Sequence, residues 1–499
     1  MKKLKSFVTL LATVIFLNLF SVHVSIPAAK AEAADPKDIS LPKTDFKEIP
    51  EVMIGDESLE KSFIIRIDDE NDSLDVIRYL DGFDTESYLI FPINVKYLNE
   101  EGVIRDKSNT LYEIEDDKYL CANLDNDIRT YFPKNLSEGI KLVYGENEIL
   151  FKPNTELVTE KQGYISDSTV VYQDAFGEGT DLVAKSTFTG NKSDIVLNSY
   201  TGKNSFEYFF EMNDMSLSYE SGAASIIDSK GNAVCSFGEI YIEDSAGHFT
   251  FGTAEALDDH VLRVTVPEDF LKGKDTTYPV TIDPDLYLTT TDTYGFPNIS
   301  NAILSSALKL TGGSVTESTY MMFQPDPYYV SDIETIIKFP HLYWVMKDMS
   351  NISYASLKLF RKTAYQGTTD VNITGKPITQ SWNMGSYSAS AYTALYNATS
   401  ESFNTTGKVK VGASATGSNI FVITSLANHW REGNWIDSNG GVYGIHFSAS
   451  GNAPLFHGAT TATASRMPRL VLQIPYNATG TIMDAVYMIN PTRLILFLL

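Results

Sequence analysis

Short apolar runs separated by turn residues recur through most of this 499-residue chain, and they constrain its fold more than any other feature. Between residues 61 and 286 the apolar residues of such runs tend to alternate with polar ones, and Gly, Asn and Asp stand between the runs. Because successive side chains of a strand point to opposite faces, this pattern is typical of antiparallel β-strands. Examples are residues 63–67, 88–91, 141–144 and 206–210. The sequence therefore predicts an all-β fold.

A second strand-rich part, residues 287–476, differs from the first in composition. Charged residues become fewer, and Ser, Thr, Ala, Gly and Asn become more frequent. The strand spacing predicts a β-sandwich of jelly-roll type. One helical turn is expected at 425–431, where Leu426 and Trp430 are four residues apart on one face. All four tryptophans lie in this part: Trp344, Trp382, Trp430 and Trp435.

The first 34 residues have the pattern of a secretory signal peptide. Lysines at positions 2, 3 and 5 precede an apolar core at 7–20, and Ala29 and Ala31 form a small-x-small cleavage site. A membrane anchor is the alternative, but the core is short for a span of about 20 residues. We therefore expect a secreted protein, extracellular or associated with the cell wall, with no membrane span after signal cleavage.

Two further segments complete the expected organisation. Residues 35–60 are polar and acidic and contain three prolines, which is typical of a flexible lead-in. Residues 477–499 end on a run of large apolar side chains, an unusual end for a soluble secreted protein. We expect 477–499 to be the truncated start of a further module in a longer parent protein.

The net charge and the cysteine content restrict partners and cross-links. A formal net charge of −24 argues against a nucleic-acid partner, because neutralising phosphates requires a basic face. Two cysteines, Cys121 and Cys235, cannot make a disulfide framework. A single disulfide and two separate buried thiols both remain open.

A search for catalytic motifs gives no match. The chain has no Gly-x-Ser-x-Gly elbow, His-Glu-x-x-His pair, Cys-x-x-Cys pair or phosphate-binding glycine loop. The sequence therefore predicts that the protein is not an enzyme and has no catalytic, cofactor-binding or metal-binding residues. The acidic run at 68–72 resembles a calcium loop in charge alone, so a structural calcium ion stays an open alternative.

One aromatic side chain is a candidate ligand contact. Trp435 lies in a predicted loop beside Asn434 and Asp437. An exposed indole can stack on a sugar face while amide and carboxylate groups bond its hydroxyls. For Trp435, core packing and ligand stacking are equally weighted alternatives, whereas Trp382 and Trp430 each end an apolar-spaced segment and are predicted to be core residues.

Residues 287–475 resemble a DNRLRE domain, which is similar to the family 96 carbohydrate-binding modules. The likeness rests on the strand at 352–359, on Trp382, on the segment 421–424 followed by Trp430, and on the closing strand at 467–472. Val422 stands where that family has an acidic residue. The resemblance implies a sandwich that binds carbohydrate.

Residues 61–286 resemble the region that precedes this domain in secreted Gram-positive wall-associated and YD-repeat proteins. The sequence Tyr-Pro-Val-Thr-Ile-Asp-Pro at 278–284 carries most of this likeness. The resemblance implies a non-catalytic region that leads into C-terminal repeats, toxins, lectin modules or peptidases.

Together these patterns predict a secreted, monomeric, non-catalytic protein that binds cell-wall or extracellular polysaccharide through its sandwich. Two alternatives stay open. The chain could be a scaffold or presentation region of a larger secreted toxin or effector with no ligand of its own, or a polysaccharide-degrading enzyme that uses paired carboxylates. The sequence does not specify the glycan.

Overall fold

The computed structural model describes most of the chain and assigns the described residues to one compact unit, Thr44–Leu499. The predicted signal peptide and the acidic run at 68–72 lie outside the described residues, as do most of 35–60 and 477–499. The described residues are 50–53, 64–67, 73–81, 85–220, 223–237, 240–288, 307–311, 314–317, 320–321, 334–339, 341–382, 385–386, 389–458, 461, 463–475 and 486–488.

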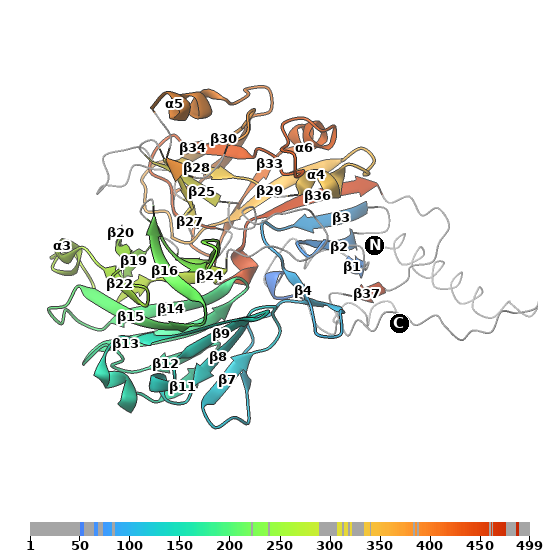
Figure 1. The fold of residues 1–499 in the computed structure, drawn as a ribbon. Coiled ribbons are helices and arrows are strands. Elements are labelled where there is room, and N and C mark those ends of the chain that lie inside the picture. Colours follow the sequence, from blue (N-terminus) through green and yellow to red (C-terminus); the bar gives the residue numbers. More distant parts are fainter. Residues whose placement is uncertain are drawn as a thin grey trace, which may run out of the picture. The chain divides into compact units, whose positions relative to one another are not determined.

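The protein is all-β, as the alternation predicted (Figure 1). Every strand pairing in the sheets is antiparallel, and the helices of the described part are short. They include α3 (Glu268–Leu271), α4 (Leu342–Met346), α5 (Ala389–Asn397) and α6 (Thr424–Arg431). The helical turn predicted at 425–431 is therefore confirmed as α6.

Two sheets of the N-terminal part form the first sandwich. In the first sheet the order is β21 (Thr253–Ala256), β22 (Val261–Thr265), β15 (Ser205–Met212), β10 (Asn147–Pro153), β9 (Ile140–Tyr144), β8 (Arg129–Pro133), β7 (Tyr119–Asn123) and β6 (Tyr112–Glu113). In the second sheet it is β11 (Gly163–Ser166), β12 (Thr169–Tyr172), β13 (Thr180–Thr187), β14 (Gly190–Leu197), β24 (Asp285–Leu288), β18 (Ala233–Phe237), β17 (Ala223–Asp228) and β16 (Met215–Glu220). The strands β19 (Tyr241–Asp244), β20 (Phe249–Phe251) and β23 (Val280–Asp283) extend the second sheet through the β14–β23 and β23–β19 pairings.

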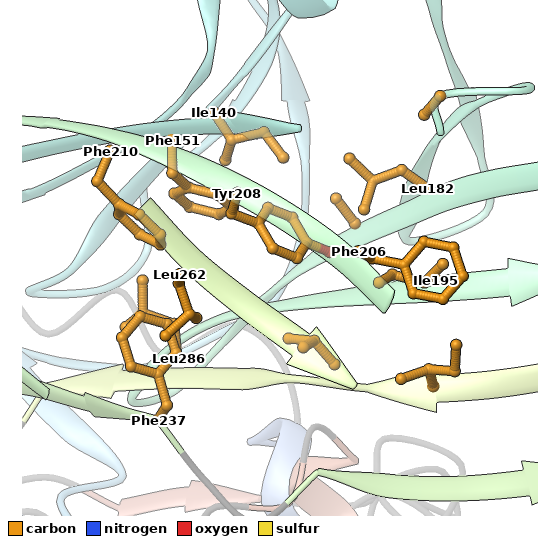
Figure 2. Close-up of a cluster of buried hydrophobic side chains, with 14 of the residues drawn as sticks. Ile140, Phe151, Leu182, Ile195, Phe206, Tyr208, Phe210, Phe237, Leu262 and Leu286 are labelled. Carbon is orange, nitrogen blue, oxygen red and sulfur yellow. The ribbon is translucent and has the colours of Figure 1, made fainter. Parts of the chain in front are cut away.

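Aromatic side chains fill the space between these two sheets (Figure 2). On β15, Phe206, Tyr208 and Phe210 alternate with more exposed residues and point inward. The Phe210 ring stacks on Phe151 at 5.6 Å between centroids and meets Phe237 of the second sheet edge-on at 5.7 Å. Each such ring contributes about 1.5–3 kcal/mol through burial, so this core can hold the sandwich together without a disulfide.

Two further sheets form the second sandwich. One has the order β33 (Ser418–Val422), β29 (Tyr354–Phe360), β36 (Arg469–Pro475), β3 (Thr85–Ile90), β2 (Val76–Asp81), β1 (Ile64–Ile67) and β37 (Val486–Met488). The other has the order β31 (Gly385–Ser386), β26 (Ser314–Glu317), β25 (Ala307–Thr311), β28 (Glu334–Ile337), β34 (Ile445–Ala449), β30 (Val371–Pro377) and β32 (Thr405–Val409). From β28 to β30 the chain passes from one sheet to the other and back, as in a jelly-roll-type sandwich. Two small two-stranded sheets stand apart from these sheets: β27 (Tyr320–Met321) with β35 (Phe456–His457), and β4 (Lys96–Leu98) with β5 (Ile104–Asp106).

The sheet that contains β36 crosses the predicted boundary at 286/287. β3 pairs with β36, with Leu89 opposite Val471, so strands near the N-terminus complete a sheet of the second sandwich. Arg469 reinforces this connection, since its buried guanidinium donates to the backbone oxygen of Val52 at 2.6 Å. The division of the chain at 286/287 stays a prediction about the sequence, and the sheets themselves are continuous across it.

The cysteines and two of the tryptophans are core residues. Cys121 and Cys235 are free and buried, so of the two open alternatives the structure has two separate thiols. Burial raises the pKa of the Cys121 thiol to about 12 and that of the Cys235 thiol still further above its ordinary value, which keeps both protonated. Trp430 and Trp382 are buried, as predicted.

Candidate functional site

The loop that follows α6 carries the ligand residues predicted from the sequence. Trp435 is half-buried, in the left-handed backbone region at φ 54°. Its ring packs edge-on against His429, with 4.3 Å between centroids, and against Phe403 at 5.6 Å. Part of the indole is thus used in packing, and the remainder faces outward.

The two polar residues predicted beside Trp435 have partners within the protein. The side-chain amide of Asn434 donates to the backbone oxygen of His429 at 3.1 Å. Asp437 accepts from the backbone N–H groups of Asn439 and Gly441 at 2.9 Å each, and it lies 3.9 Å from the Lys338 ammonium. Both side chains shape the loop, and their role as ligand residues stays a prediction.

A more exposed tryptophan lies next to this loop and was not singled out from the sequence. Trp344 of α4 is 40% exposed. Its indole N–H donates to the backbone oxygen of Asn439 at 2.7 Å, and Gly440 lies so close that a Cβ there would be 2.2 Å from the indole nitrogen. A glycine at φ 79° therefore lets the loop come close beside the ring. We call Trp344, Tyr343, Trp435 and the loop residues Asp437 and Asn439 the aromatic face.

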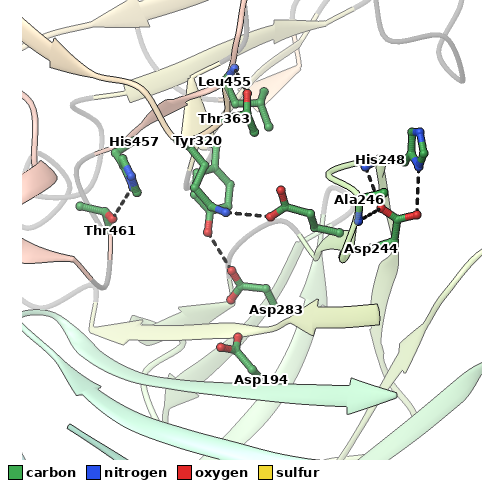
Figure 3. Close-up of polar contacts among 12 residues, drawn as sticks. Asp194, Asp244, Ala246, His248, Asp283, Tyr320, Thr363, Leu455, His457 and Thr461 are labelled. Atoms are coloured by element: carbon green, nitrogen blue, oxygen red, sulfur yellow. Dashed lines mark hydrogen bonds and ion pairs between the residues drawn. The ribbon is translucent and has the colours of Figure 1, made fainter. Parts of the chain in front are cut away.

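A second candidate site is a polar cavity of about 330 Å³. It lies where β14, β19 and β23 of the first sandwich meet the β27–β35 pair and the segment before β36 (Figure 3). We call it the polar cavity. Its lining combines three lysines, three carboxylates, one imidazole, two phenols and three threonines: Lys185, Lys192, Lys362, Asp194, Glu243, Asp283, His457, Tyr241, Tyr320, Thr281, Thr461 and Thr463.

The deepest charges of the polar cavity form one cluster. The ammonium of Lys192 is in direct ion-pair contact with Asp283 and lies 3.5 Å from the Asp194 carboxylate. The hydroxyl of Tyr320 donates to the same Asp283 oxygen at 2.9 Å, as Figure 3 shows. A buried cation is therefore enclosed by two carboxylates and a phenol, which offsets its loss of hydration.

A second group of contacts lies around this cluster. Lys362 pairs with Glu243 at 2.7 Å, and its ammonium lies 5.6 Å from the centroid of the Tyr241 ring and 5.8 Å from that of Tyr320. His457 places its Nδ1 2.8 Å from the hydroxyl oxygen of Thr461. These contacts connect β19, β27 and β35 around one polar space.

Burial shifts the titration of two groups in the polar cavity. It raises the pKa of Asp194 to about 6, with Lys192 opposing the shift and Asp283 adding to it. Burial also lowers the pKa of His457 to about 3, helped by the positive charges of Lys362 and Arg466. Near neutral pH the imidazole is uncharged, and Asp194 takes up a proton just below neutrality.

The two candidate sites offer different chemistry. The aromatic face can stack on a flat apolar surface and offer polar atoms at its edge, whereas the polar cavity places a carboxyl that protonates readily beside an amine. Within the described ranges no group of three His, Cys, Asp or Glu residues could hold a metal ion. No helix among the described residues is both long and apolar enough to span a membrane.

Comparisons with known proteins add relatives but no family assignment. No protein-family model matches the chain. It is 24% identical over 383 residues to the tRNA3(Ser)-specific nuclease WapA of Bacillus spizizenii, and 23% identical over 381 residues to the tRNA nuclease WapA of Bacillus subtilis strain 168. Each alignment covers 69% of this chain and 15% of the relative, so the chain spans less than a sixth of these relatives.

These names correct two predictions made from the sequence, that the protein is not an enzyme and that it has no nucleic-acid partner. The relatives are named as nucleases of tRNA, which are enzymes that act on nucleic acid. Both predictions used signals that are too coarse. A net charge sums over the whole chain and says nothing of a local site, and motif searches miss groups that folding assembles from distant segments.

The exo-β-1,3-galactanase of Phanerochaete chrysosporium aligns over 76% of this chain and 98% of its own, but with 8% identity and a TM-score of 0.11. That likeness carries no argument about fold or function.

Proposed function

We propose that this chain is an exported, wall-associating region similar to part of the WapA nucleases, and that residues 287–476 bind cell-wall polysaccharide as a DNRLRE-type sandwich. The observation that carries the proposal is the aromatic face, where an exposed indole lies beside polar loop residues. The resemblance of residues 61–286 to the region found in secreted wall-associated proteins supports the same setting. Residues 1–34 would direct export.

The aromatic face suits weak binding to a repetitive polymer. A sugar ring would stack on the Trp344 indole, and the exposed Asn439 would bond its hydroxyls. A single stacked ring binds weakly, but a wall polymer presents many equivalent rings close together, so a bound molecule that dissociates rebinds readily. Retention at the wall then needs no deep pocket.

A co-sedimentation assay with purified cell-wall sacculi tests the proposal. The full chain should pellet with the sacculi, and Trp344→Ala should weaken binding by about tenfold, because losing one stacked ring costs roughly 1.4 kcal/mol. Tyr164→Ala is the matched control, since Tyr164 is an exposed aromatic of the first sandwich, 46% accessible. A wild-type chain that stays in the supernatant, or a Trp344→Ala variant that pellets equally well, would rule out this function.

The relatives' names favour a second candidate function, action on tRNA. It applies to this chain as a proposal, because the matched region is 15% of each relative. Incubation of the purified chain with total tRNA, followed by a denaturing gel, tests it. Cleavage that disappears in Asp194→Asn would locate the activity in the polar cavity, whereas intact tRNA would leave wall binding as the supported function.

A further inference from the structure

The register of two neighbouring strands brings three reactive side chains to one place. β14 and β23 are antiparallel with Ile195 opposite Ile282, so Asp194 stands opposite Asp283. Lys192 lies two residues before Asp194 on the same strand and therefore on the same face. One amine and two carboxyl groups thus face the polar cavity from adjacent strands.

These three side chains are in contact and largely removed from solvent. The side chains of Lys192, Asp194 and Asp283 are 9%, 14% and 5% exposed. The amine of Lys192 touches Asp283 directly and is 3.5 Å from Asp194. The amine and the carboxyl group that an amide bond would join are therefore already positioned against each other, and a second carboxyl group lies beside them.

We propose that Lys192 and Asp283 join in an intramolecular amide bond, with Asp194 transferring the protons. This inference is independent of wall binding. It concerns a covalent modification of the chain by itself, and the described residues supply every reacting group.

The reaction is a condensation that balances without a cofactor or an oxidant. The ion pair first exchanges a proton, which gives a neutral amine and a neutral carboxylic acid. The lone pair of the Lys192 Nζ attacks the Cγ of Asp283 and forms a tetrahedral carbon. Asp194 accepts a proton from the nitrogen and returns one to a hydroxyl on that carbon. The C–O bond breaks, and the products are one amide and one water molecule.

The surroundings favour each part of this reaction. A largely buried site favours the neutral amine and acid over the ion pair more than bulk water does, because it hydrates the charges less fully. Burial raises the pKa of Asp194 to about 6, so this carboxyl can both hold and release a proton near neutral pH. The Tyr320 hydroxyl donates to Asp283 at 2.9 Å and can polarise the carbonyl under attack. The polar cavity gives the released water a place to go.

The bond would change how the fold responds to a pulling force. Residues 192 and 283 are 91 positions apart, so the amide would close a loop that contains β15 and β22. A force that pulls on the two ends of the chain would then pass from β14 directly to β23. The segment between them would be shielded from extension, and its unfolded ensemble would be restricted as by a disulfide.

Mass spectrometry of the purified full chain tests the proposal. The intact mass should be lower than the mass computed from its sequence by one water molecule, after the N-terminus has been read from the same sample. Proteolysis should yield a branched peptide that contains both Lys192 and Asp283. A wild-type protein of full sequence mass, with both residues in unmodified linear peptides, would overturn the proposal.

Three variants separate the amide from an ordinary ion pair. Lys192→Arg keeps the positive charge and removes the amine nucleophile, and Asp194→Asn keeps the shape and removes the proton carrier. Both should show the full sequence mass and no branched peptide while circular dichroism confirms the β-fold. Lys376→Arg, at the exposed pair with Glu401, is the matched control and should still lose water. A branched peptide at wild-type yield in Asp194→Asn would contradict the role of that carboxyl.

Discussion

The strand β14 faces two different environments. On one side, Ile195 and Leu197 are buried in the aromatic core of the first sandwich. On the other, Lys192 and Asp194 face the polar cavity. Burial stabilises the first face in proportion to its apolar area, whereas on the second face burial costs free energy until each charge finds a partner. The comparison teaches that one strand can contribute both the stability of the fold and a site for chemistry.

The largest effect is expected on the apolar side. Phe210→Ala should lower the free energy of unfolding by about 3–5 kcal/mol, because it leaves a cavity between two packed rings. Guanidinium denaturation measures the change. Tyr219→Ala, at an exposed ring of the same sandwich, is the control and should cost under about 0.5 kcal/mol. Equal losses of unfolding free energy in the two variants would contradict this comparison of the two faces, because burial would then not determine the contribution of a ring to stability.

The polar side should differ in its pH dependence. His457 has a lowered folded-state pKa of about 3, so below about pH 6.5 the unfolded chain binds a proton that the folded chain does not. Its stabilising contribution is present above that pH and is lost as the pH falls. Between pH 6 and pH 4 the wild type should lose about 2–3 kcal/mol relative to His457→Gln.

Asp194 should act in the opposite direction over nearly the same range. Its folded-state pKa is raised to about 6, so the folded chain gains stability relative to the unfolded chain as the pH falls through that value. The test of His457 is therefore the difference between denaturation curves of wild type and His457→Gln at each pH. A difference that does not change from pH 6 to pH 4 would contradict the burial of a neutral imidazole.

A smaller effect is expected at the edge of the polar cavity. Lys362→Met should cost about 1 kcal/mol, because it leaves the partly buried Glu243 without its ammonium partner. Thermal unfolding at low and high salt measures the change, which salt should reduce. Lys376→Met at the more exposed pair with Glu401 is the control and should cost less. A larger loss in the control would show that burial does not strengthen these pairs.

The smallest effect on stability is expected at the aromatic face. Trp344→Ala removes a ring that is 40% exposed together with its hydrogen bond to Asn439, so we expect the free energy of unfolding to fall by no more than about 1 kcal/mol, alongside the tenfold loss of wall binding. Denaturation and co-sedimentation of the same preparation measure both quantities. Trp435→Ala should cost more stability, since its ring packs on His429. Strong destabilisation by Trp344→Ala would make this face structural.

The sequence predicted the features that depend on interactions between residues close together in the chain. Alternation identified the strand at 206–210, which is part of β15, and the four-residue spacing of Leu426 and Trp430 identified α6. The pairing of β3 with β36 could not be predicted, because Leu89 and Val471 are brought together by the fold and not by any local pattern. The close contact of Trp344 with Gly440 likewise could not be predicted, because Gly440 is a distant loop residue.

The polar cavity could not be predicted from the sequence for the same reason, because the fold brings its residues together from distant segments. In the sequence, Lys192 and Asp194 are charges two residues apart in a strand-like segment, a pattern that is usual for a solvated strand face. Asp283 is 91 positions from Lys192, and Tyr320 comes from the separate β27–β35 pair. The charge pattern alone cannot distinguish a solvated face from one that another part of the fold covers.

Tandem mass spectrometry of the proteolytic fragment that contains Lys192 tests the contrast between the two faces of β14 most directly. We predict fragment ions of a branched peptide in which the side chain of Lys192 carries the side-chain carbonyl of Asp283. Fragment ions that assign an unmodified Lys192 and an unmodified Asp283 to separate linear peptides would contradict the account.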